Sequence, residues 1–96
     1  MKVTILDEAE QDLLDGYCFY EAQGQGLGDY FLDSLFADID SLRFYAGIHA
    51  QCHGYHRLLS RRFPFAVYYR VEDGFAGVRA VLDCRRDPER TKNRLA

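Results

Sequence analysis

Arginine is the residue type in this sequence with the clearest chemical potential. Residues 1–48 carry 2 bases and 10 acids, a net charge of −8, whereas residues 49–96 carry 10 bases and 5 acids, a net charge of +5. Nearly all bases of the second half are arginines, whose planar guanidinium groups bind phosphates and carboxylates. We expect these charges to cancel partly inside the protein and the remainder to face nucleic acid or an acidic partner. The arginines considered are Arg57, Arg61, Arg70, Arg79, Arg85 and Arg86.

A second group that could do chemistry is a short run of possible metal ligands. Its spacing matches no standard zinc motif, and it lies where a helix is expected to lead into a strand. We therefore interpret it as a polar loop and expect neither a metal nor any other cofactor. The three cysteines are widely spaced, and we expect all of them to be unpaired thiols. The possible ligands are His49, Cys52, His53 and His56.

The first half of the chain must position these groups through two helices. Residues 2–6 resemble a short strand, and apolar residues at helical spacing predict a helix over 8–23, capped by Asp7 and Glu10 in a capping box. Glycines at 24, 26 and 28 follow this helix, so they form a turn and no dinucleotide-binding motif, which would follow a strand. A second helix is predicted from about Asp29 to Ala46, with Gly47 as its C-terminal cap.

The second half has the pattern of strands. We predict strands over 55–61, 65–71 and 75–83, with Asp73 and Gly74 in a tight hairpin turn and a bulge at Gly77. Tyr68 and Tyr69 lie on the central strand and face opposite ways, so we expect core packing for one of them. A last helical turn could start at Asp87 and Pro88. The predicted fold is α+β, in the order β-α-α-β-β-β, with a helical hairpin packed on a small, mostly antiparallel sheet.

Length and hydropathy favour one domain, residues 1–96, in the cytoplasm. A chain of 96 residues supports one core. No apolar run approaches the roughly 20 residues that a membrane-spanning helix needs. The N-terminal apolar stretch is too short and too soon acidic for a signal peptide.

The predicted acidic helical hairpin is followed by two characteristic segments, RFPFAVYYRVEDG and VLDCRRDP. The chain resembles the RelE/ParE superfamily of bacterial toxins, over essentially its whole length. The resemblance implies the toxin of a type II toxin–antitoxin module, held inactive by a cognate antitoxin. It also implies one of two activities: inhibition of DNA gyrase in the ParE-like branch, or ribosome-dependent cleavage of mRNA in the RelE-like branch.

The nuclease branch requires a base, an acid and cations around a phosphate. Alternation along the strand 75–83 puts Arg79 and Asp83 on one face. Some nuclease relatives carry a histidine where this chain has Asp83. Asp83 could act as a base, but its ordinary pKa of about 3.9 makes it a poor acid at pH 7. We favour an ion pair with Arg79 or Arg85. If the protein were a nuclease, its candidate catalytic residues would be Arg57, Arg61, Arg79, Asp83 and Arg85.

The ParE-like branch, which inhibits DNA gyrase, is therefore the favoured hypothesis, and no catalytic residue is assigned. A third hypothesis is a small homo-oligomeric protein without toxin activity, and the arginines fit a solvated basic face equally well. The residues predicted to bind the antitoxin or the target are Arg57, Arg61, Arg79, Arg85 and Arg86.

Overall fold

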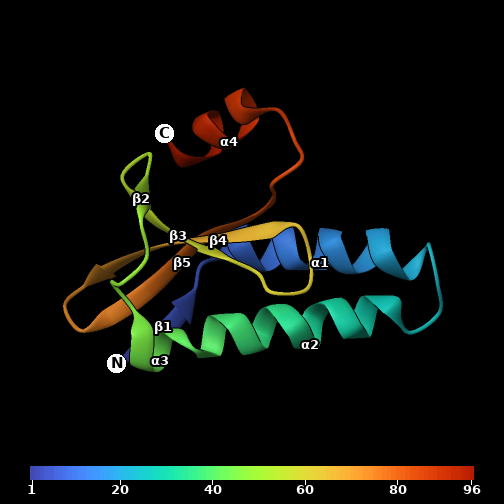
Figure 1. The fold of residues 1–96 in the computed structure, drawn as a ribbon, viewed down its shortest axis with the longest axis horizontal. Helices are drawn as coiled ribbons and strands as arrows, with labels where there is room; N and C mark the ends of the chain where they lie inside the picture. The colour runs from blue at the N-terminus through green and yellow to red at the C-terminus, as the bar shows by residue number, and fades with distance from the viewer.

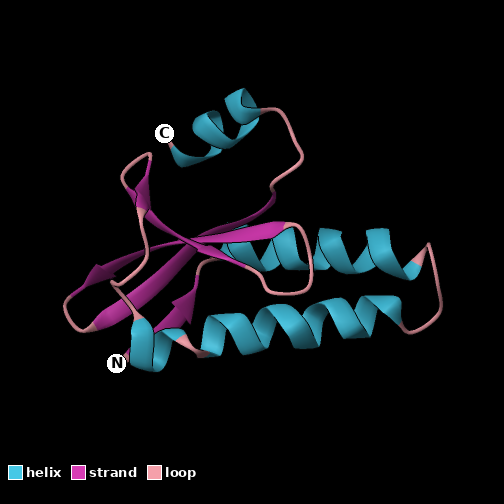
Figure 2. Ribbon diagram, in the orientation of Figure 1, coloured by secondary structure: helices cyan, strands magenta, loops and turns pink.

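The protein is built in three layers around one sheet. The computed structural model describes residues 1–96, and Figures 1 and 2 show α1 and α2 on one face of the sheet and α4 on the other. The predicted α+β architecture, with a helical hairpin packed on a sheet, is confirmed. The elements are β1 (Lys2–Ile5), α1 (Asp7–Glu21), α2 (Leu27–Asp40), α3 (Leu42–Tyr45), β2 (Gln51–Cys52), β3 (Tyr55–Leu59), β4 (Phe65–Glu72), β5 (Phe75–Asp83) and α4 (Pro88–Leu95).

The sheet has five strands in the order β1-β5-β4-β3-β2. β1 runs parallel to β5, and every other neighbouring pair is antiparallel. The sequence did not fix the place of β1, and the structure puts it at the β5 edge, where Val3 and Ile5 pack against the core. β2 was not predicted, because two residues are too few to show a strand period.

The helical hairpin and the sheet enclose the larger of two apolar clusters. Phe31, Leu35 and Ile39 of α2 pack against Leu13 of α1 and the helix-side residues of β4 and β5. Full burial of a side chain such as Phe31 contributes about 1.5–3 kcal/mol. The two helices approach closely at Gly16, where a Cβ atom would lie only 2.4 Å from Cζ of Phe31. Glycine at this position therefore sets the distance between α1 and α2.

The ends of the helices differ in part from the prediction. Leu6 is the residue before α1 and no side chain caps that helix, so the capping box of Asp7 and Glu10 is wrong. Asp7 instead begins the helix, where its charge still favours the N-terminal dipole. The second predicted helix is divided into α2 and α3 at Ser41, whose hydroxyl donates to the Asp38 carbonyl.

The C-terminal half also extends the prediction. The strand predicted over 55–61 ends at Leu59, and the last helical turn is a helix of eight residues, with the Asp87 carboxylate accepting from the amide of Glu89. The bulge predicted at Gly77 is wrong, because Gly77 is paired with Arg70. The register shift leaves Arg79 as the extra residue of β5.

Candidate functional site

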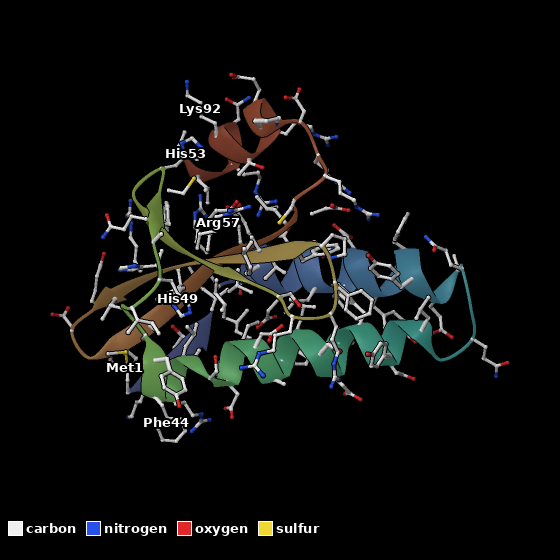
Figure 3. The ribbon with its side chains drawn as sticks, in the orientation of Figure 1. Met1, Phe44, His49, His53, Arg57 and Lys92 are labelled. Carbon is white, nitrogen blue, oxygen red and sulfur yellow. The ribbon has the colours of Figure 1, made fainter.

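The face of the sheet toward α4, here called the α4-side face, carries Arg57. Tyr55 and Tyr68 form this face with Ala66 and Ala80, and Leu95 of α4 is buried against them. Figure 3 shows Arg57 in the space between the sheet and α4. The Arg57 guanidinium donates to Oη of Tyr68 at 3.3 Å and to Sγ of Cys84 at 3.6 Å. The bond to Tyr68 is the main reason that the pKa of Arg57 is raised. Arg57 therefore keeps its charge without a carboxylate partner.

A network of charged groups fastens α4 to α1 and β5. Arg94 donates two hydrogen bonds to the Asp12 carboxylate, at 2.8 and 2.9 Å, and lies 3.5 Å from Glu8. Asp12 also accepts from the backbone amide of Val81 at 3.0 Å. Arg79 donates to Glu8 at 3.0 Å. Two of the basic residues near the β5 edge are thus already bound by acids of α1.

Asp83 forms an ion pair with Arg85, at 2.8 Å, as the favoured interpretation predicted. Hydrogen bonding to Arg85 lowers the pKa of the Asp83 carboxyl, with burial acting in the opposite direction. The prediction that Arg79 and Asp83 lie on the same face of the sheet is wrong, because side chains do not alternate strictly along β5. The extra residue at Arg79 shifts the pattern, so that Val78 and Val81 both join the helix-side cluster.

The nuclease candidates therefore have separate partners. Arg57 binds Tyr68, Arg79 binds Glu8, and Asp83 binds Arg85. Arg61 lines a groove on the other side of β3. Among the five, only Asp83 and Arg85 are joined by a hydrogen bond or ion pair.

Arg86 lies in a cleft of about 280 Å³ between α1, β5 and α4. Arg86 is exposed, has no acidic partner within ion-pair distance, and shares the cleft with Arg90. Phe19 of α1 lines the same cleft with 52% of its surface exposed. Neither Arg90 nor Phe19 was predicted from the sequence. An eight-residue helix beginning at Asp87-Pro88 would have placed Arg90 and Arg94 on one face, but the direction of that helix could not be foreseen.

The residues of the possible metal cluster do not converge on one site, because His49 and His56 are hydrogen-bonded beside Tyr69 while His53 lies in a turn. Nδ1 of His49 is hydrogen-bonded to Oη of Tyr69, and Nδ1 of His56 to the His49 carbonyl at 2.7 Å. His53 lies in the turn before β3, with a positive φ of 53°. Figure 3 shows His49 and His53 well apart. No three His, Cys, Asp or Glu residues are arranged to hold a metal ion.

Tyr69 organises this corner of the core. Its ring is fully buried on the helix side of β4 and stacks on the imidazole of His56, with 5.1 Å between the two ring centroids. Its hydroxyl also accepts a hydrogen bond from the amide of Gly47. Burial, with a smaller contribution from His56, lowers the pKa of His49. Tyr68 is buried as well, because α4 covers the opposite face of the same strand. Core packing therefore applies to both tyrosines and not to one alone.

Comparison with known proteins identifies the fold. No protein-family model and no curated protein matches the sequence. None of the helices has the length and apolar character needed to cross a membrane. A chain of the structure described as "Chromosomal ParDE TA system from P. aeruginosa" matches with a TM-score of 0.77 and 20% identity. The match covers 84% of this chain and 92% of that chain. The RelE/ParE-like fold that the sequence predicted is thereby confirmed.

Proposed function

We propose that residues 1–96 form the toxin of a type II toxin–antitoxin module that acts in the bacterial cytoplasm. The observation that carries this proposal is the fold shared with a chain of a ParDE toxin–antitoxin system over nearly the full length of both chains. A partner is also favoured by the surface, on which large apolar side chains remain exposed. They include Phe19, Phe44, Tyr45, Ile48 and Leu59.

The antitoxin is proposed to bind through acidic residues. Arg57, Arg61 and Arg86 have no carboxylate within ion-pair distance, whereas Arg79 and Arg85 are held by Glu8 and Asp83. Of the five arginines predicted to bind a partner, these three are therefore the ones with an unused charge. An acidic segment of the antitoxin would meet them without first breaking an internal ion pair.

DNA gyrase is the proposed target. The supporting observation is the state of Asp83, whose pKa is lowered by Arg85, so that it is ionised at neutral pH and cannot act as a general acid. The arginines can bind a phosphate backbone or an acidic protein surface, but cations alone supply only part of the catalysis of RNA cleavage.

The alternative is a ribosome-dependent mRNA endonuclease. One contact favours it: Arg57 donates to the Tyr68 hydroxyl on the α4-side face, which places a cation beside a phenol. Such a pair could bind a phosphate and exchange a proton. Against it, Tyr68 is 4% exposed and lies beneath α4.

Expression in cells, followed by two assays, tests the function. We expect the chain to stop growth unless the product of the adjacent reading frame is co-expressed. The purified chain should inhibit gyrase-catalysed supercoiling and leave ribosome-bound mRNA intact. Asp83→Ala should retain toxicity, whereas Arg86→Glu should weaken antitoxin binding and Lys92→Glu, on exposed α4 surface, should not.

The contradicting results are distinct. Discrete mRNA cuts in the ribosomal A site, lost in Arg57→Ala or Tyr68→Phe, would replace the gyrase proposal with the nuclease. Normal growth on expression, with a stable homo-oligomer in solution, would instead support the protein without toxin activity.

A further inference from the structure

β1 leaves one edge of the sheet without a neighbour. It is the first strand in the order β1-β5-β4-β3-β2 and pairs with β5 alone. In that pair the Lys2 amide donates to the Gly74 carbonyl, so the backbone of Lys2 faces β5. Because backbone groups of successive residues point to opposite sides of a strand, the amides and carbonyls of Val3 and Ile5 point away from β5. Neither residue has a backbone hydrogen bond to a helix or loop. Four hydrogen-bonding groups are therefore free along this edge.

Exposed apolar side chains border the same edge. Met1 and Leu6, at the two ends of β1, are 50% and 46% exposed, and Phe44 of α3 is 81% exposed. α3 lies beside the start of β1, where the Met1 amino group donates to the Arg43 carbonyl at 3.3 Å (Figures 1 and 3). Exposed apolar side chains beside unpaired backbone groups favour the addition of another strand.

The charges at the two ends of β1 are opposite and largely unused. Lys2 has no ion pair, and its amine lies 5.8 Å from the centroid of the Phe75 ring. At the other end, the first turn of α1 carries Asp7, Glu8 and Glu10. Of these acids, Asp7 and Glu10 are exposed and also lack an ion pair. A strand that runs antiparallel to β1 and begins with a base would meet this acidic turn.

We infer that the occupant of this edge is a second copy of the chain, with the two β1 strands antiparallel and a twofold axis at Thr4. In this register Val3 of one copy lies opposite Ile5 of the other, and the two residues exchange both of their free backbone hydrogen bonds. The symmetric pair forms on the other side of the axis, so all four free groups of each copy are used. The product is one sheet of ten strands, five from each copy.

The side chains fit this register. Residues opposite each other on antiparallel strands point to the same face, so Val3 and Ile5 meet on the helix side, where both already pack against the core. Thr4, which is exposed, meets Thr4 of the second copy, and such threonine pairs are favourable. Lys2 lies opposite Leu6 of the second copy, beside its acidic first turn of α1. No like charges face each other across the axis.

A strand of a different protein is the alternative occupant. The twofold arrangement favours a second copy, because one short strand supplies both the basic start and the acidic end, and each contact is made twice. The reversed strand also brings Met1 and Phe44 of one copy to the end at which Leu6 of the other is exposed. Both α4-side faces then lie on one side of the joined sheet, so that Arg57 of each copy faces the same way.

A disulfide trap tests the register in the full chain. Thr4→Cys places two thiols at a non-hydrogen-bonded pair, where the Cα atoms lie about 4.5 Å apart, within the range of a disulfide. On oxidation we expect a covalent dimer joined at position 4, identified by mass spectrometry of its peptides. Gln51→Cys, at an exposed position of the opposite edge strand β2, is the matched control and should give at least about tenfold less dimer. The wild-type chain, oxidised in parallel, corrects for its three natural thiols.

Sedimentation equilibrium measures the reversible dimer. Thr4→Lys puts two like charges opposite each other at the axis and should weaken dimerisation at least about tenfold. Gln51→Lys makes the same change in net charge and should weaken it less than about twofold. Lys2→Glu and Asp7→Lys should each weaken the dimer, and the two together should restore it to within about threefold of the wild type, because the charges are exchanged across the interface. Circular dichroism should show the wild-type fold in every variant.

Several results would overturn the inference. They are a wild-type chain that stays monomeric up to about 1 mM, equal trapping of Thr4→Cys and Gln51→Cys, and a charge exchange that restores nothing. A dimer that Thr4→Lys leaves intact would place the contact elsewhere on the molecule. Growth arrest and its relief by the adjacent reading frame are measured separately, so a monomeric chain leaves the proposed function standing, and a dimer without toxicity leaves this interface standing.

Discussion

Replacement of Asp12 by alanine is the most direct test of how α4 is held over the sheet. The Asp12 carboxylate is 10% exposed and accepts two hydrogen bonds from Arg94 and one from the amide of Val81. Asp12→Ala leaves that amide without a partner at the β5 edge, and leaves Arg94 only its longer contact with Glu8.

The expected loss follows from these contacts. Hydrogen bonds to charged groups contribute about 1.5–3 kcal/mol each, and breaking a fully buried ion pair costs about 3–5 kcal/mol. Arg94 is 34% exposed, so solvent screens part of the pair. We therefore expect the free energy of unfolding to fall by about 3 kcal/mol in Asp12→Ala. Asp12→Asn, which keeps an acceptor for Val81, should lose about 1–2 kcal/mol.

Urea denaturation measures the loss of stability, and limited trypsinolysis measures how often α4 opens. Asp15→Ala is the control, since Asp15 binds only Gln11 on exposed surface and should change stability by less than about 0.5 kcal/mol. Trypsin should cut at Arg90 and Lys92 faster in Asp12→Ala, because α4 opens more often. A stability equal to that of Asp15→Ala, or additive effects of Asp12→Ala and Arg94→Ala, would refute the assignment of this network as the fastening of α4.

Two further outcomes are expected. Gly16→Ala should destabilise the protein by about 1–3 kcal/mol, because the new Cβ atom would collide with the ring of Phe31, even though alanine favours helix more than glycine does. Gly24→Ala is the control, since the nearest side-chain atom to its Cβ would be 3.9 Å away. Equal urea midpoints for the two variants would contradict the close approach of α1 and α2 at Gly16. Burial lowers the folded pKa of His49 below 6.5, so the stabilising effect of its neutral form is complete above pH 6.5 and is lost as the pH falls through the folded pKa. His49→Gln should flatten that part of the stability–pH curve, while His53→Gln, in the exposed turn, should retain it; an unchanged curve for His49→Gln would show that another group titrates.

The strongest sequence patterns predicted the fold well. Leu35 and Ile39 recur at helical spacing, and Asp73-Gly74 marks the hairpin between β4 and β5, because both signals are local. The partner of β1 was beyond local reasoning, since the pairing of Val3 with Ala76 joins residues far apart in the sequence. Asp12 is the same kind of case: an acid on an amphipathic helix resembles a solvated residue until α4 brings Arg94 to it.

The candidate site was less predictable than the fold. The sequence pointed to Arg57 and Arg86 and to an ion pair of Asp83 with Arg79 or Arg85, which the structure shows with Arg85, but the ion pair of Arg79 with Glu8 of α1 was not predicted. The face of the sheet predicted for Arg79 from alternation was wrong, because a β-bulge depends on the register between two strands and cannot be recognised from the sequence of one strand. The free edge of β1 was not predicted, since an unpaired edge is a property of the sheet order and not of any residue type.

The hydrogen bond from Val81 to Asp12 has a consequence for how this protein can assemble. β1 covers β5 only as far as Val78, and the Asp12 carboxylate occupies the amide of Val81 beyond it. Growth of a sheet from chain to chain requires two complementary free edges on every molecule. The stretch of β5 that β1 leaves uncovered is therefore closed to another chain by a side chain. A strand of a second molecule could join the sheet only at its two ends, beside β1 or beside β3 and β2.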